Sequence, residues 1–408
     1  MAPAEIVVSD PVRVGGVKPF VLYRVTSRLF DDRDVSVLRR YSDFDWLLER
    51  LRSDHKDCVV PPLPPKQLVG ALEDEFIESR RRGLQRFLSK VASHTKLSQS
   101  QHFRIFLTES DEKFAATRNL NLDVVATAST TWVNRFTKQI VVATKTLAES
   151  ISHPLQETIS SGSGDSDAFD EKHAAVLRRE SLHRRLSLAA RSTVQRSQAS
   201  AAALLALGQS LSQFGRAEED EELAAVCVDL GNALVAVAGV NRGSAERDAA
   251  LFEEPLAEAV GMAEAIRIAF ENRREVKDAH YEVLQRVSRK RDEVEGVEFF
   301  SDYIDPLAVE EMAKVKATQL DALKDVARKS RQSFDSFSSR ILDEHLSSIN
   351  LLASDMKECL PAYAQGKVRC IYSYSVFYSG LINVQMELGI KSKLVCREFV
   401  SKYPTLTP

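Results

Sequence analysis

The chain has 408 residues, of which 44% are apolar and 28% are charged, and its formal net charge is −3. This length predicts two or three domains, with enough apolar material for a substantial core. The near-neutral balance excludes a chain-wide attraction to nucleic acid, so any surface that binds anions has to be local.

Strand and helix signals alternate in the first part of the chain, up to about residue 107. Stretches rich in β-branched and aromatic residues predict three strands, at 6–8, 20–25 and 35–38. Helical periodicity predicts helices over 43–52 and 74–94. Between these helices, Pro61-Pro62-Leu63-Pro64-Pro65 cannot form a helix or a central strand, so we expect an extended, polyproline-like loop.

Basic residues accompany three of these elements. Arg40 and Tyr41 lie where the third strand passes into a helix, Lys66 ends the proline loop, and Arg80 lies near the start of the second helix. The planar fork of Arg holds phosphate through two hydrogen bonds, Lys acts as a point charge, and a Tyr face suits the apolar side of a sugar-like ring. Cations on three separate elements therefore predict an anion site.

Each of these residues also has an ordinary structural explanation. Arg40 could pair with a nearby acid at 31, 32 or 34, an exposed contact that contributes ~0–1 kcal/mol. Tyr41 and Phe44 could be core residues, and Arg81, Arg82 and Arg86 could form a solvated helix face. Acidic residues are dense beside the cations, at 43, 45 and 73–75, so binding would have to rest on recognition of a headgroup rather than on general attraction to acidic lipid.

The order of RRYSDF at 39–44, PPLPPK at 61–66 and FIESRRRGLQRFL at 76–88 resembles the PX domain, over about residues 6–109. The resemblance implies a three-stranded sheet with helices and a pocket for a 3-phosphorylated phosphoinositide. In that pocket Arg40 would hold the 3-phosphate, Tyr41 would stack under the inositol ring, Lys66 would reach the 1-phosphate side, and Arg80 would bind the 4- and 5-hydroxyls. The proline loop would enter the headgroup region with three apolar wedges: Val59, Val60 and Leu63.

A linker over residues 116–169 follows, with a Ser/Gly-rich break at 160–164. Within it, 131–148 is predicted to be an amphipathic helix with Trp132, Phe136 and Ile140 along one side. Such a helix could lie on lipid, or it could pack the first domain onto the helices that follow.

Almost everything after the linker reads as helix, in three long segments at 171–240, 244–295 and 306–361. Helices of about 50 residues, roughly 75 Å long, are typical of an elongated bundle or coiled coil. Apolar residues spaced alternately by four and three form stripes: Leu342, Leu346, Ile349, Ala353, Met356 and Leu360 in the third segment, and Leu204, Leu207, Leu211 and Phe214 in the first. Periodicity leaves open whether these stripes are an internal core or a dimer interface.

The helical part, residues 170–365, resembles the BAR domain of sorting nexins on LGQSLSQFG at 207–215 and IRIAFENR at 266–273. The resemblance implies an antiparallel three-helix coiled coil that dimerises, with itself or with another BAR sorting nexin, and binds curved membrane. Six cations are candidates for that surface: Arg178, Arg185, Arg196, Arg273, Lys277 and Arg291. Long solvated helices carry such residues in any case. The extension 366–408 does not match the family, and 371–378 alternates like a strand.

No catalytic pattern appears in the sequence. The eight histidines form no HExxH, the five cysteines form no CxxC pair, and there is no P-loop and no GxSxG. We therefore expect that the protein is not an enzyme and has no cofactor and no metal site. We also expect no secretory signal and a location in the reducing cytosol.

The prediction is an α+β PX domain at 1–115 followed by an all-α BAR domain. Such a chain would be a peripheral membrane adaptor on endosomes, binding phosphatidylinositol 3-phosphate in protein sorting, with retromer as a further partner. The alternative is a cytosolic coiled-coil scaffold whose PX fold serves protein contacts.

Overall fold

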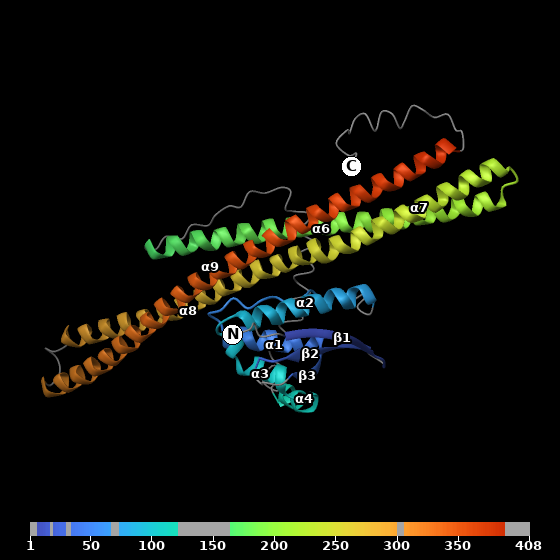
Figure 1. Cartoon of the computed structure of the whole chain (residues 1–408). Coiled ribbons are helices and arrows are strands. Elements are labelled where there is room, and N and C mark those ends of the chain that lie inside the picture. Colours follow the sequence, from blue (N-terminus) through green and yellow to red (C-terminus); the bar gives the residue numbers. More distant parts are fainter. Residues whose placement is uncertain are drawn as a thin grey trace. The chain divides into compact units, whose positions relative to one another are not determined.

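The computed structural model describes residues 6–16, 19–29, 34–66, 73–120, 164–299 and 306–387 (Figure 1). They fall into two compact units. One comprises the first 180 residues with 261–349, and the other comprises 181–260 with the residues from 350 onward.

An antiparallel sheet opens the first unit, with strands β1 (Ile6–Val14), β2 (Phe20–Ser27) and β3 (Val35–Arg40) in that order. Alternate residues of β2 point inward, so Val21, Tyr23 and Val25 are buried and Arg24 is exposed. The three predicted strands are confirmed.

Five short helical elements complete the PX-like part: α1 (Tyr41–Asp54), α2 (Asp74–Ser93), the 3-10 turn η1 (Leu97–Gln99), α3 (Gln101–Thr108) and α4 (Asp111–Leu120). The predicted helices at 43–52 and 74–94 are confirmed within two residues. Large apolar side chains from α1, α2 and α3 meet the sheet in one core, for example Phe44, Phe87 and Phe106. Burying each contributes about 1.5–3 kcal/mol.

Arg39 of β3 lies inside this domain, with 0% of its surface exposed. Its guanidinium donates to the carbonyl oxygens of Phe106 (3.0 Å) and Glu109 (2.6 Å) and to the Asp111 carboxylate (2.9 Å). It also lies 4.2 Å from the centre of the Phe114 ring. Burial lowers the pKa of Arg39, and the carboxylate of Asp111 opposes that shift. Arg39 therefore fixes α3 and α4 against the sheet.

Long helices form the rest: α6 (Gly164–Ala217), α7 (Glu221–Asp248), the π-helical turn η2 (Ala249–Glu253), α8 (Glu254–Phe299) and α9 (Pro306–Glu387). The elements α7, η2 and α8 form one continuous helix. Together with α6 and α9 they give three long helices, as predicted. The predicted boundary near 240 is wrong, since the chain turns at 218–220. There the Asp220 carboxylate caps α7 by accepting from the amide of Leu223 at 2.9 Å.

The tail differs from prediction as well. Residues 371–378, predicted as a strand, belong to α9, which continues to Glu387. Ser373 Oγ donates to the Arg369 carbonyl at 2.9 Å, one turn earlier. A serine between tyrosines thus satisfies its hydroxyl within a helix, a pattern that alternation alone cannot separate from a strand.

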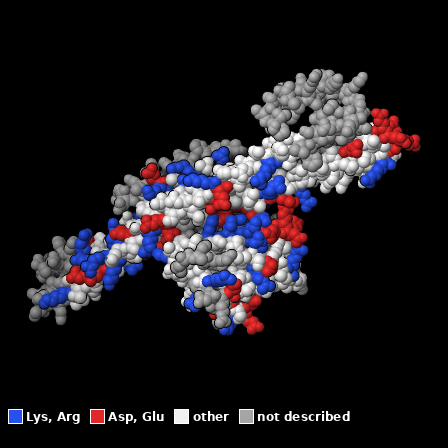
Figure 2. Space-filling view, in the orientation of Figure 1, with Lys and Arg blue, Asp and Glu red and all other residues white. Residues whose placement is uncertain are grey.

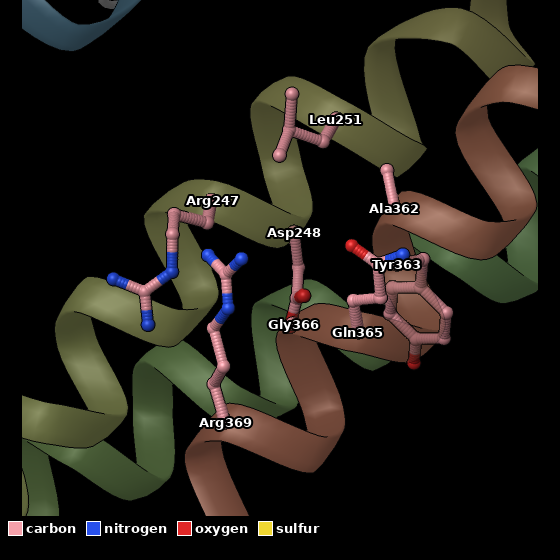
Figure 3. A pocket seen from close by; sticks show the side chains of 8 residues that line it. All are labelled: Arg247, Asp248, Leu251, Ala362, Tyr363, Gln365, Gly366 and Arg369. Atoms are coloured by element: carbon pink, nitrogen blue, oxygen red, sulfur yellow. The ribbon is translucent and has the colours of Figure 1, made fainter.

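The π-helical turn is packed against α9 in the second unit. Phe252 stacks on Tyr363 with ring centroids 4.0 Å apart, and the buried Asp248 carboxylate pairs with Lys367. A small cavity lies beside this contact, and Arg247 and Arg369 are among the residues that line it (Figure 3).

Of the ten residues in the predicted apolar stripes, five are exposed in the single chain and five are half-buried. Leu346 is 61% exposed, Leu207 52% and Phe214 53%, whereas Met356 packs against a small core with Phe252 and Leu256. Of the two interpretations left open, an internal core does not account for Leu207, Phe214, Leu346 and Leu360, which are exposed in the single chain.

One helical stretch within the described residues, Glu221–Glu293, is apolar enough by length and composition to cross a membrane, with an 18-residue window of mean hydropathy 2.0. Only 17% of that window is buried. A single helix of this kind carries little weight as a membrane span. It does show that α7 presents apolar surface.

Glycines allow α6 and α7 to approach closely. A Cβ placed on Gly208 of α6 would lie 2.6 Å from the carbonyl oxygen of Gly231 on α7, whereas a Cβ on Gly239 would meet nothing within 4 Å. Backbone cannot yield as a flexible side chain can, so the contact requires glycine at position 208.

We expect Gly208→Ala to lower the free energy of unfolding by about 1–3 kcal/mol, because the methyl group would separate the two helices. Gly239→Ala is the matched control and should raise it by up to about 1 kcal/mol, since alanine is the better helix former. Urea denaturation followed by circular dichroism measures both. Equal effects in the two variants would contradict the close-packing argument.

Candidate functional site

Arg40 ends β3 and Tyr41 begins α1, so strand alternation turns Arg40 away from the buried Arg39. The Arg40 side chain is 39% exposed, lies 3.6 Å from the Asp43 carboxylate and has its guanidinium carbon 5.9 Å from the centre of the Phe20 ring. The Asp43 carboxylate also accepts from the Arg40 amide at 2.9 Å. Arg40 is thus held at the start of α1 with part of its cation open to solvent.

Of the three acidic residues expected as alternative partners of Arg40, at 31, 32 and 34, only Asp34 is among the described residues, and it pairs with another arginine. Asp34 pairs with Arg28, and positions 31 and 32 lie outside the described residues. The Asp43 carboxylate has a second cation in Arg118, at 2.7 Å.

Arg80 of α2 lies between two aromatic rings. Its guanidinium carbon is 4.5 Å from the centre of the Tyr41 ring and 4.3 Å from that of Phe76. Partly desolvated stacking of this kind contributes about 1–2 kcal/mol per ring. Tyr41 therefore already presents a face to Arg80, while its proposed contact with an inositol ring stays a prediction.

Among the described residues, two buried polar atoms beside this stack, Arg80 Nε and Tyr23 Oη, make no hydrogen bond of ordinary geometry. Burial raises the pKa of Tyr23, and the charge of Arg80 opposes that shift. The sequence analysis did not identify Tyr23 as a residue next to the candidate site. The signal that could have identified it is a hydroxyl-bearing side chain at an inward position of β2.

Tyr41 also fixes the proline loop, because its hydroxyl donates to the Pro64 carbonyl at 2.6 Å. Pro64 in turn lies on Gly83 of α2, where a Cβ would come within 2.7 Å of the proline ring. Lys66 follows and pairs with Asp45 of α1 at 2.7 Å. The loop, α1 and α2 are thereby joined around Tyr41, which brings Lys66 and Arg80 to the same part of the domain.

The neighbouring arginines of α2 serve other contacts. Arg81 donates to the Val8 carbonyl at 2.7 Å and to Glu78, and so ties α2 to β1. Arg82 lies 3.6 Å from Glu78. Arg81 is structural rather than simply solvated.

The predicted membrane wedges are wrong for Val59 and Val60, which are each 3% exposed and so present no surface to a bilayer. Val60 belongs to the core of the first domain. Leu63 is half-buried and packs against the same core. The predicted interfacial residues Trp132, Phe136 and Ile140 lie outside the described residues.

The six cations predicted for a basic surface differ in exposure, and their membrane role stays a prediction. Arg178, Arg185, Arg196 and Arg291 are exposed and Lys277 is half-buried. Arg273 is 8% exposed, donates to Ser338 Oγ at 2.9 Å and lies 3.4 Å from the centre of the Phe169 ring. Its assignment to the surface is wrong, because it joins helices from inside. Figure 2 shows acidic groups interspersed among the cations of the helices on the visible face.

Comparison with known proteins shows which families this chain is similar to. A family model described as PX domain matches residues 27–110, and one described as Vps5 C terminal like matches residues 144–370. Sorting nexin-30 of Homo sapiens is 39% identical over 115 residues, which cover 26% of this chain and 26% of that protein. Vacuolar protein sorting-associated protein vps5 of Schizosaccharomyces pombe is 39% identical over 113 residues, 26% of this chain and 20% of that protein.

Among solved structures, the cryo-EM structure of the SNX-BAR Mvp1 tetramer matches with a TM-score of 0.65. The match covers 92% of this chain and 99% of that chain at 17% identity, and so supports the fold alone. The segment matched in the curated relatives spans about a quarter of their length.

Fold and site define a class of protein: a PX domain followed by a long helical region of the BAR type. Since the second family model covers residues 144–370, more than half of the chain, the chain belongs to the Vps5 C-terminal-like family of PX-BAR sorting nexins. Members of this group are peripheral membrane proteins, and neither matched family is catalytic.

We expect Arg273→Ala to lower the free energy of unfolding by about 2–4 kcal/mol, because it removes a buried, hydrogen-bonded and stacked side chain. Arg291→Ala, which removes the same charge from an exposed position, should change it by less than about 0.5 kcal/mol. Chemical denaturation of both variants measures the difference. A small effect at position 273 would return that residue to the candidate surface.

Proposed function

We propose that this chain is a peripheral membrane adaptor that binds phosphatidylinositol 3-phosphate through Arg40, Tyr41, Lys66 and Arg80. It acts in endosomal protein sorting, as a homodimer or heterodimer, with retromer as a further partner. The observation that carries the proposal is that Tyr41, which follows Arg40 in sequence, contacts Arg80 of α2 and binds the proline loop two residues before Lys66. The names of the relatives support the sorting role, since both matched proteins are named for sorting.

The charge balance of the site argues for recognition of a strongly charged headgroup. Arg40 and Lys66 each have a carboxylate partner on α1, Asp43 and Asp45. A lipid headgroup with one negative charge would gain little binding free energy by competing with a carboxylate that is already paired with the cation. A phosphate monoester carries about −1.5 to −2 charges at pH 7 and three acceptor oxygens, so it can replace or share such partners.

Arg40→Ala should weaken binding to vesicles containing phosphatidylinositol 3-phosphate at least ~30-fold, because truncating one partner of a charge-assisted contact costs about 2–5 kcal/mol. Arg104→Ala, an exposed cation on α3, should bind like the parent. Vesicle co-sedimentation of the full chain gives both affinities. Equal pelleting of Arg40→Ala and the parent would mean that the helices bind by charge alone, and no pelleting of a folded parent would favour the scaffold function.

Exposed apolar positions on α6 support the dimer. Leu207 and Phe214 lie one heptad apart on α6 and are each more than half exposed in the single chain, so a second chain could cover both. Charged residues at the interface would select between a second copy of this chain and another BAR sorting nexin.

The double variant Leu207→Asp, Phe214→Asp should be monomeric, because a carboxylate in an apolar interface loses its hydration. The double variant Leu207→Met, Phe214→Leu keeps the interface apolar and should dimerise like the parent. Sedimentation velocity at micromolar concentration separates the two outcomes. Dimers of unchanged stability in the Asp variant would remove α6 from the interface.

A further inference from the structure

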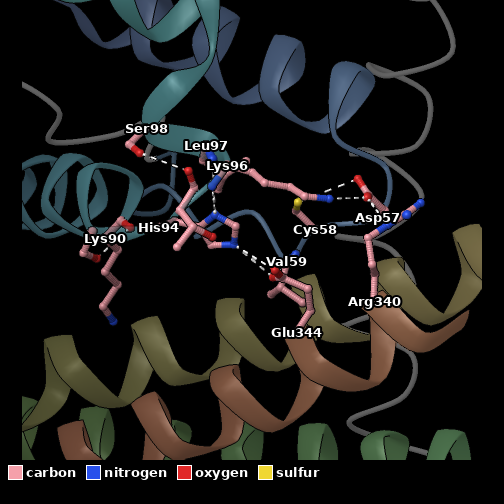
Figure 4. Close-up of polar contacts among 12 residues, drawn as sticks. Asp57, Cys58, Val59, Lys90, His94, Lys96, Leu97, Ser98, Arg340 and Glu344 are labelled. Atoms are coloured by element: carbon pink, nitrogen blue, oxygen red, sulfur yellow. Dashed lines mark hydrogen bonds and ion pairs between the residues drawn. The ribbon is translucent and has the colours of Figure 1, made fainter. Parts of the chain in front are cut away.

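Glu344 of α9 contacts the chain segment that leads into the proline loop. Its carboxylate accepts from the amide of Val59 at 3.1 Å and from His94 Nε2 at 3.0 Å (Figure 4). Glu344 is largely buried, with 19% of its side chain exposed. A residue 285 positions away in sequence therefore satisfies a backbone donor two residues before Pro61.

The proton on His94 can be assigned from its surroundings. The amides of Lys96 and Leu97 both donate to His94 Nδ1, at 3.2 Å each, so Nδ1 is an acceptor. The proton therefore lies on Nε2, which donates to Glu344. This hydrogen bond is fixed in direction by the turn that follows α2.

Cys58 completes the cluster, since its sulfur, a ring nitrogen of His94 and a carboxylate oxygen of Glu344 lie within 4.8 Å of one another. The set has the donor types of a zinc site. A metal would need the lone pair of Nε2 and a proton on Nδ1, where two amides already point. Burial raises the pKa of the Cys58 thiol to about 12, so the sulfur is a protonated, packed group. Hydrogen bonding explains the cluster better than metal does.

Neighbouring contacts hold the same segment. The Asp57 carboxylate lies 2.7 Å from Lys96 Nζ and 2.6 Å from Arg340 Nε of α9. Burial alone would raise the pKa of Asp57, but the two cations hold it below its ordinary value. Asn272 of α8 donates to the Lys56 carbonyl at 2.9 Å. Residues 56–59 are thus bound by side chains from both helices.

The segment is connected to the candidate lipid site by a stiff stretch of chain. Val60 is anchored in the core, and Pro61, Pro62, Pro64 and Pro65 each have a fixed φ. The stretch ends at Lys66, two residues after Pro64, whose carbonyl oxygen accepts a hydrogen bond from the Tyr41 hydroxyl. The fixed φ angles of the four prolines reduce the freedom of this stretch, so the positions of Val59 and Lys66 are coupled in part, while Val60 and Pro64 are each held by further contacts.

We infer that Glu344 is a positioning residue of the lipid site: from the helical region it fixes the start of the proline loop and thereby the placement of Lys66. This inference rests on the proposed function. The headgroup site is then assembled fully only when the PX domain is docked on α8 and α9. Lipid affinity becomes a property of the whole chain rather than of its first 115 residues alone.

The contact itself is tested without lipid, by hydrogen exchange in the full chain. Glu344→Ala should speed exchange of the Val59 amide at least ~10-fold, because that amide loses its acceptor. Alkylation of Cys58, followed by mass spectrometry of its peptide, should become faster as well. Asp343→Asn, an exposed neighbour with the same loss of charge, should change neither rate. Protection of Val59 that survives in Glu344→Ala would overturn the inference.

The consequence for lipid is tested with vesicles containing phosphatidylinositol 3-phosphate. Glu344→Ala should bind about fivefold more weakly than Asp343→Asn, since a loosened loop must be ordered on binding. Glu344→Gln retains an acceptor oxygen for Val59 and should lie between them. Faster exchange with unchanged lipid affinity would leave Glu344 a docking contact only and overturn the positioning role. Failure of the parent to bind this lipid would overturn the proposed function, while the exchange result would still report on the contact.

Discussion

The PX domain depends on a single buried guanidinium. Arg39 has no exposed surface, and it satisfies carbonyl oxygens at the end of α3 and the carboxylate that begins α4. A buried cation costs several kcal/mol unless its donors are paired, so the ends of these helices are confined to positions that pair them. Strand alternation then leaves Arg40 no choice of side. Arg40, the candidate phosphate-binding residue, faces outward because its neighbour Arg39 has to face inward.

Elements whose signals are local could be predicted from the sequence, and those that depend on distant partners could not. The three strands, α1, α2 and the proline loop follow from periodicity and proline chemistry. Val59 and Val60 looked like membrane wedges because nothing near them in sequence shows that Glu344 and the core cover them. Arg273 looked solvated for the same reason, since its aromatic partner and Ser338 lie far along the chain. The turn at 218–220 was missed although Asp220 is a good N-cap, because the apolar run of α7 hid the helix end.

The candidate site combines cations with their own counterions. Asp45 and Asp43 hold Lys66 and Arg40 in place, and they also neutralise much of the positive charge of the candidate site. Such a site discriminates among anions better than it attracts them. Long-range attraction and residence on a membrane would have to come from elsewhere in the chain, through two copies or through exposed cations of the helices. Linking weak sites in one assembly raises effective concentration without any new contact.

The π-helical turn at Ala249–Glu253 has a consequence for how relatives are aligned. A π turn accommodates one more residue than an α turn, so the side chains after it are rotated by roughly 100° relative to an uninterrupted α-helix. A gapless alignment with a relative that lacks this turn would pair interior positions of one protein with surface positions of the other from residue 254 onward. Substitutions that look radical in such an alignment would be artefacts of phase. The insertion should therefore be placed at the Phe252–Tyr363 stack before residues of α8 are compared between members of the family.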